Sequence, residues 1–149
     1  MKKTRATDAT DAYVFDTSAL LTLWNDEEGA DLVEHLLRSG AHIYVSFMSC
    51  MEGQYRIWKN AGRTESEEFV KYLDLLPIEK INVTDSILEK AIEIKATNDL
   101  SVCDGFIAAT AIASGSILVH KDPEFEQLKT IVKLRPLPYK PRTREKVSE

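Results

Sequence analysis

The stretch Tyr13-Val14-Phe15-Asp16-Thr17-Ser18 contains the change of pattern that decides the fold class. Tyr13 to Phe15 form a short apolar run rich in β-forming residues, as in a buried strand, and the run stops at Asp16. From Ser18 onward, apolar residues recur at spacings of three and four, which indicates amphipathic helices. The chain therefore begins its ordered part with a buried strand that is followed at once by a helix.

The same alternation continues along the chain. Further short apolar runs predict strands at 42–45, 78–83, 117–119 and 131–134. Helical patterns separate them, including 64–76, where Thr64 and Glu67 have the spacing of a capping box, and 104–114. Strands that alternate with helices of this length imply right-handed crossovers and a sheet covered on both faces. We expect an α/β fold: a single three-layer α/β/α domain with a mostly parallel five-stranded sheet.

Length and composition fit one domain with two tails. The 149 residues suit a single core. The expected division is a flexible N-terminal arm over 1–12, the domain over 13–134, and an extended basic C-terminal tail with three prolines over 135–149. A hydrophobic content of 44% excludes a disordered chain.

Charge and cysteine content narrow the function classes. With 19 Lys+Arg against 24 Asp+Glu, the net charge is −5, which argues against binding nucleic acid by bulk charge alone. Cys50 and Cys103 fit neither a disulfide framework nor a zinc site. No apolar core follows the basic residues Lys2, Lys3 and Arg5, so we expect no secretory signal. No apolar stretch is long enough for a bilayer, and we expect a cytoplasmic protein without a membrane partner.

Four carboxylates lie near the ends of predicted strands or the starts of helices, where parallel sheets usually have their functional residues. Asp16 directly follows the first strand, Glu52 lies in the helix after the second, Asp104 opens a helix of small residues, and Asp122 follows the fourth strand. Each has an ordinary alternative: Asp16 or Asp104 as a helix cap, Asp122 as a turn residue, and Glu52 as a surface partner of Arg56.

Such a cluster implies a particular chemistry. Carboxylates that share a cleft repel one another unless a cation joins them, and hard oxygen ligands without His or Cys favour Mg²⁺ or Mn²⁺. A bound ion of this kind lowers the pKa of a water molecule and neutralises charge on a phosphate. The four residues therefore indicate metal-dependent hydrolysis of a phosphodiester.

The order of motifs resembles the PIN-domain ribonucleases, which include VapC-type toxins of toxin–antitoxin pairs. The resemblance covers residues 13–134. It is carried by Val-Phe-Asp16-Thr17-Ser18, Ser-x-x-Ser-x-x-Glu52, Asp104-Gly-Phe-Ile-Ala-Ala-Thr-Ala and Leu-Val-His120-Lys-Asp122-Pro-Glu-Phe.

The resemblance implies a metal-dependent endoribonuclease with a defined set of residues. Asp16, Glu52, Asp104 and Asp122 would be the catalytic, metal-binding acids for Mg²⁺ or Mn²⁺. The side chains expected around them are Thr17, Ser18 and His120; His120 departs from the Thr or Ser that is frequent in the family. A cognate antitoxin and a homodimer are expected partners. The rival hypothesis is a PIN-like module that binds RNA or protein without cutting it.

Contacts to RNA would come from nearby basic residues. Arg56 and Lys59 follow Glu52 on the same helix, Arg63 lies at the exit of that helix, and Lys121 precedes Asp122. A solvated helix face explains the first three equally well.

Overall fold

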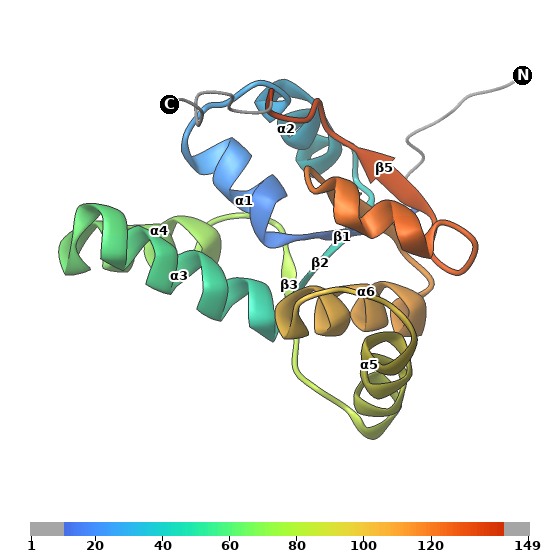
Figure 1. The fold of residues 1–149 in the computed structure, drawn as a ribbon. Helices are drawn as coiled ribbons and strands as arrows, with labels where there is room; N and C mark the ends of the chain where they lie inside the picture. Colours follow the sequence, from blue (N-terminus) through green and yellow to red (C-terminus); the bar gives the residue numbers. More distant parts are fainter. Residues whose placement is uncertain (1–10, 142–149) are drawn as a thin grey trace, which may run out of the picture.

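The computed structural model describes residues 11–141, so residues 1–10 of the expected arm and 142–149 of the expected tail lie outside it. The chain alternates between strands and helices, as Figure 1 shows. The elements are β1 (Ala12–Phe15), α1 (Thr17–Trp24), α2 (Ala30–Arg38), β2 (His42–Ser46), α3 (Phe47–Ala61), α4 (Arg63–Asp74), β3 (Glu79–Ile81), α5 (Asp85–Thr97), α6 (Val102–Ser114), β4 (Ile117–His120), the 3₁₀ helix η1 (Pro123–Leu128) and β5 (Leu134–Pro136).

The five strands form one parallel sheet in the order β3-β2-β1-β4-β5. The predicted fold class is therefore confirmed. β1 lies at the centre, with β2 and β4 on its two sides. The chain first builds outward to β3 on one side and then returns to build β4 and β5 on the other. The carboxyl ends of β1 and β4 thus flank the point where the strand order reverses, which is the usual ligand site of such sheets.

Side chains of β1 alternate between the two faces of the sheet. Tyr13 and Phe15 pack with buried residues of α1 to α4, whereas Val14 packs with buried residues of α5, α6 and η1. All three side chains are buried. Figure 1 shows the same division, with α3 beside α4 and α5 beside α6 on separate sides of the strands. The sheet is the middle of three layers.

The bounds of two strands differ from the predicted ones. The third strand is only Glu79–Ile81 rather than 78–83, and the fifth strand, expected at 131–134, is Leu134–Pro136. Val132 is buried in a turn after η1, where its N–H donates to the Leu128 carbonyl, so the apolar run there serves a turn instead of a strand. The chain keeps pairing beyond Pro136, because the Leu137 N–H donates to the His120 carbonyl at 2.7 Å and the Leu137 side chain is buried.

The predicted capping box at Thr64 is also wrong. α4 begins at Arg63 after Gly62, which has a φ of +99°, and no side chain caps it. Glu67 instead pairs with Arg63 at 3.1 Å one turn away. In the described part of the chain, no helix is both long and apolar enough to cross a membrane.

Candidate active site

Asp16 is the buried carboxylate at the end of the central strand. Its Oδ1 accepts a hydrogen bond from the Ala19 N–H at 2.7 Å, so it caps α1, and the Ser18 hydroxyl lies 2.7 Å from both carboxylate oxygens. Burial raises the pKa of Asp16 to about 7; the charges of Asp104 and Asp122 add to this, and the bonds from Ser18 and Ala19 oppose it. The capping alternative is thus correct, and the same carboxylate also faces two other acids.

Asp104 lies in the first turn of α6 but does not cap it. The cap is Ser101, whose hydroxyl accepts from the Asp104 N–H at 3.1 Å, so the carboxylate of Asp104 is not used to cap the helix. Burial is the main cause that raises the pKa of Asp104 to about 7. The negative charges of Asp122, Glu52 and Glu124 raise it further, and a hydrogen bond with the Ser101 side chain opposes the rise. A helix start here places an acid at the positive end of a helix dipole, where an anionic group is favoured.

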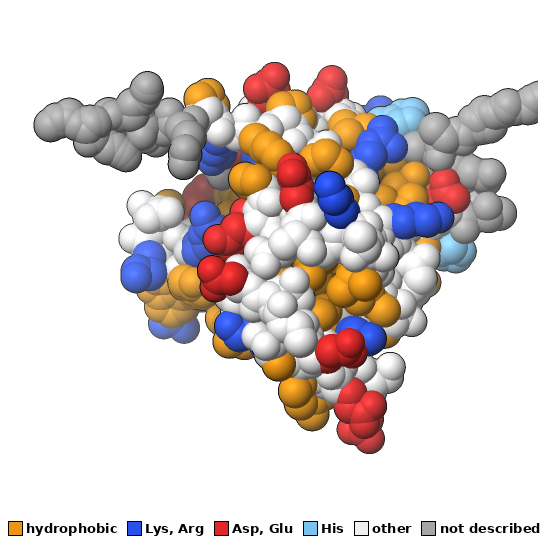
Figure 2. Space-filling view, turned by 45° about the vertical axis from the view of Figure 1, so that its right-hand side comes forward, with side chains coloured by type: hydrophobic (Ala, Val, Ile, Leu, Met, Phe, Trp, Pro, Cys, Tyr) orange, Lys and Arg blue, Asp and Glu red, His pale blue; other side chains and the backbone are white. Residues whose placement is uncertain are grey.

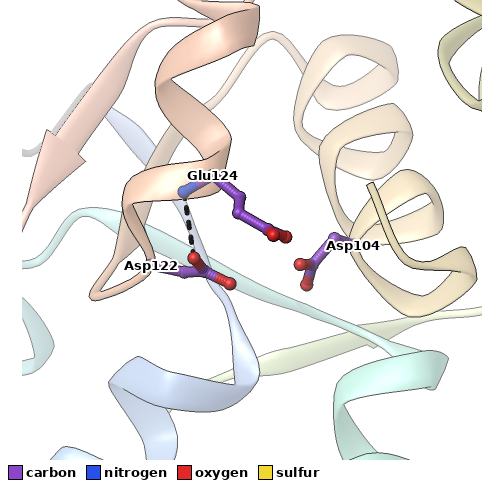
Figure 3. Close-up of side chains that lie close together, drawn as sticks. All are labelled: Asp104, Asp122 and Glu124. Carbon is purple, nitrogen blue, oxygen red and sulfur yellow. Dashed lines mark hydrogen bonds between the residues drawn. The ribbon is translucent and has the colours of Figure 1, made fainter. Parts of the chain in front are cut away.

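Asp104, Asp122 and Glu124 form a cluster whose carboxylate oxygens lie within 4.8 Å of one another. Figure 3 shows Asp104 on one side, facing Asp122 and Glu124 across the gap between two helices. Asp122 caps η1 by accepting from the Glu124 N–H at 2.9 Å, and this turn directs both acids to the same place. Glu124 is a member of the site that the sequence did not single out; its one signal is its position two residues after Asp122.

Glu52 is held by a residue far away in the sequence. Its Oε1 accepts a hydrogen bond from Thr17 Oγ1 at 2.6 Å. Glu52 is half-buried on α3 and forms no ion pair with Arg56 in the part of the chain that is described. The surface-pair alternative is therefore wrong, and Thr17, the residue that follows Asp16, orients Glu52.

His120 is a buried neutral contact of Asp122. Its Nδ1 accepts from the Asp122 N–H at 3.1 Å, and its ring packs against those of Phe125 and Tyr139. Burial lowers the pKa of His120. The imidazole therefore fixes the backbone at Asp122 rather than contributing charge.

The basic residues that could contact RNA differ in their exposure and in the groups that they contact. Lys121 is nearly buried, and its ammonium contacts Glu27 Oε1 at 3.4 Å and the Glu28 carbonyl at 2.8 Å, which directs it into the fold. Lys59 is exposed on α3, whereas Arg56 lines a cavity that also contains Asp122. Arg63 lies over the ring of Trp58. On the face shown in Figure 2, basic side chains lie among acidic and apolar ones.

The residues present fit a divalent cation. Asp104, Asp122 and Glu124 come together, and Asp16 and Glu52 interact electrostatically with Asp104. Across residues 11–141 no Lys, Arg or His forms an ion pair with any of these five acids. The pKa values raised to about 7 at Asp16 and Asp104 reflect burial and negative charge without a compensating cation. An all-oxygen donor set of this kind suits Mg²⁺ or Mn²⁺.

The sequence model of the PIN domain family matches residues 13–131, which contain all five of these acids. The chain belongs to the PIN domain family. The expected family is thus confirmed, and the acidic centre lies at the carboxyl edge of the sheet of this PIN domain. Among curated protein sequences, none matches the chain significantly.

Solved structures with a similar fold include several VapC-containing proteins. VapBC2 from Rickettsia felis, bound to a fragment of its promoter DNA, has a TM-score of 0.72 at 18% identity and covers 85% of this chain and 99% of that one. DNA-bound VapBC from Salmonella typhimurium gives 0.70 at 18% identity, with 85% and 98% covered. VapC20 from Mycobacterium tuberculosis, described as a sarcin-ricin loop cleaving toxin, gives 0.66 at 18% identity, with 83% and 99% covered. At this identity the likeness establishes the shared fold.

Proposed function

We propose that this PIN domain is a metal-dependent endoribonuclease that hydrolyses RNA phosphodiester bonds, and that it acts as a VapC-type toxin. The observation that carries the proposal is the convergence of Asp104, Asp122 and Glu124 within 4.8 Å, beside a buried Asp16, with no ion pair to any described cationic side chain. Acids in this arrangement are costly for a fold unless they bind a cation.

Individual residues have separable roles in this proposal. Asp16, Glu52, Asp104 and Asp122 would hold Mg²⁺ or Mn²⁺, with Glu124 as a fifth donor. A bound divalent ion supplies a water of lowered pKa and neutralises charge on the phosphate. Thr17 and Ser18 orient two of the acids by hydrogen bonds, and His120 holds the backbone of Asp122. Arg56, Lys59 and Lys121 would contact the RNA; the exposed position of Arg56 in a cavity beside Asp122 supports Arg56 most.

The proposal extends to partners. Structures of similar fold contain VapBC toxin–antitoxin complexes, which supports a cognate antitoxin for this chain. A homodimer acting on RNA in the cytoplasm completes the proposal. Light scattering of the purified chain, alone and co-expressed with the product of an adjacent reading frame, tests both associations.

Cleavage assays test the central proposal. The full chain is incubated with structured RNAs in Mg²⁺, in Mn²⁺ or in EDTA, beside Asp16→Asn and the surface variant Asp99→Asn as a matched control. Cleavage that needs a divalent ion, is lost in Asp16→Asn and persists in Asp99→Asn supports the proposal. Cleavage that survives in Asp16→Asn contradicts the assigned site. RNA binding without cleavage and without a metal-dependent shift in melting temperature favours the non-cleaving module.

A further inference from the structure

A cavity of about 550 Å³ shares Asp122 with the acidic centre. It lies between α1, α3 and the C-terminal segment at 139–140, and its lining includes Ser18 and Asp122. Sites that hold small organic molecules have volumes of about 300–1,000 Å³. The cavity is therefore adjacent to the acids and large enough to hold one nucleotide.

Flat apolar surfaces and amides line this cavity. Trp24 and Tyr139 provide rings, and Asn25 and Asn60 provide amide groups. Both rings are held in place: Trp24 packs edge-on against Phe69 and Tyr72 of α4, and the Tyr139 hydroxyl donates to Glu126 at 2.7 Å. A nucleobase requires this combination, because it has two flat faces and an edge of hydrogen-bond donors and acceptors.

One basic side chain of the cavity lining, Arg56, is free of ion pairs with the described acids and can bind a phosphate. Arg56, Lys121 and Lys140 are balanced by Glu27, Glu65 and Asp122, so the lining has no net charge. Lys121 and Lys140 both pair with Glu27, at 3.4 and 3.3 Å. Arg56 forms no ion pair with any acid in the described part of the chain, and it is exposed. A guanidinium in this state can bind a phosphate through two parallel hydrogen bonds.

We propose that this cavity binds a single unpaired nucleotide of the RNA, next to the phosphate that lies at the acidic centre, with Arg56 on the phosphate of that nucleotide and Asn60 on the edge of its base. The inference rests on the proposed ribonuclease function and names the residues of this chain that would determine where the RNA is cut. Bases in a duplex are stacked and paired, so a nucleotide enters such a cavity only from a loop, a bulge or a single strand. Binding of this kind selects the cut site by contact with a base, which suits a protein whose net charge is −5.

Binding is measured first, in an Asp16→Asn background of the full chain. The probe is a fluorescein-labelled pool of random single-stranded RNA oligonucleotides in Mg²⁺, read by anisotropy, with a duplex of the same length as competitor. We expect Arg56→Ala and Asn60→Ala each to weaken binding roughly tenfold, and Arg56→Ala to lower the salt slope by about one. Arg38→Ala on α2 and Asn82→Ala after β3 are the matched controls, because both residues are exposed and lie outside the cavity lining. Single strands are expected to compete better than the duplex.

The position of the nucleotide is then found by moving one abasic residue through an RNA that the parent chain cuts. We expect one abasic position beside the cut to reduce kcat/KM roughly tenfold, and this loss to shrink in Asn60→Ala, since the two changes remove the same contact.

The outcomes separate the two proposals. If the parent chain cuts RNA while the cavity variants and every abasic position behave as the controls do, the proposed nucleotide site is wrong. The proposed ribonuclease function is not affected by that result. The same pattern is expected if the cavity serves a protein segment instead of RNA. If the parent cuts no RNA but the cavity variants still lose binding to the single-stranded pool, the nucleotide site is supported and the cleavage function is wrong.

Discussion

Thr17 Oγ1 donates a hydrogen bond to Glu52 Oε1 at 2.6 Å, joining two residues 35 positions apart. The bond connects the first turn of α1 to α3, so the residue after Asp16 fixes an acid on a different helix. Partners that orient metal-binding carboxylates affect metal affinity or activity by about 10–100-fold when they are removed.

Thr17→Val therefore tests the orientation of Glu52. We expect RNA cleavage to fall by about 10–100-fold, because Glu52 loses its donor while all the acids remain. Thr17→Ser keeps the hydroxyl and is the control. Equal rates for Thr17→Val and the parent chain would show that the bond has no part in the activity.

Ser18→Ala tests the hydrogen bonds that stabilise ionised Asp16. The Ser18 bond opposes the rise in the pKa of Asp16, so its removal should raise that pKa further above about 7. A smaller fraction of Asp16 is then ionised at neutral pH. We expect the acidic limb of the pH–rate profile to move to higher pH. Ser114→Ala, at the far end of α6, should leave the profile unchanged, and a profile that does not move in Ser18→Ala contradicts the assignment.

The pH dependence of folding provides a test that does not require activity. Asp16 and Asp104 have folded-state pKa values of about 7, against 3.8 for the ordinary carboxyl. Between these values the folded state binds more protons than the unfolded state, so the free energy of unfolding falls as the pH rises from about 4 to about 7. In EDTA, the protein should melt at a higher temperature at pH 5 than at pH 8.

Divalent ions should reverse that trend. Mg²⁺ or Mn²⁺ binds the ionised carboxylates, so added metal should stabilise the chain more at pH 8 than at pH 5. Thermal melting in both buffers measures the effect. An Asp16→Asn, Asp104→Asn double variant should have a flatter profile and a smaller response to metal. A parent chain whose stability rises from pH 5 to pH 8 in EDTA would contradict the raised pKa values.

Lys121 should contribute more to stability than Lys140, although both contact Glu27. The side chain of Lys121 is 4% exposed and that of Lys140 is 67% exposed. Lys121→Met leaves a partly buried Glu27 with less compensation, and we expect a loss of about 2–4 kcal/mol. Lys140→Ala, an exposed pair, should cost about 1 kcal/mol or less. Urea unfolding measures both, and equal losses would contradict the buried role of Lys121.

The sequence predicts the fold well where a periodic pattern has a single structural solution. The run before Asp16 and the run before Asp122 are buried strands, and the rule that ligands lie at the carboxyl ends of such strands places both acids correctly. Val132 shows the limit: an apolar residue can be buried by a turn as well as by a strand, and only the Leu128 carbonyl that accepts its N–H decides between them.

The orientations of two side chains in or beside the site depend on contacts that the spacing of residues in the sequence does not reveal. Glu124 faces Asp104 because a 3₁₀ turn starts at Pro123 and Asp122 caps it, which no helical or strand periodicity describes. Lys121 turns inward because its partner Glu27 lies 94 residues earlier in the chain. A charged residue beside an acidic motif can thus serve the fold, and its burial is visible only in three dimensions.

β1 lies between β2 and β4, so the acidic centre is built from parts of the chain that are made at different times during synthesis. Asp16, Glu52 and Asp104 leave the ribosome before Asp122, and Leu137, which completes the core beside β4, leaves later still. A growing chain therefore holds an incomplete set of acids until Asp122 and Glu124 have been translated. Any chemistry that needs all of these acids therefore begins only after the segment that follows β4 has been made.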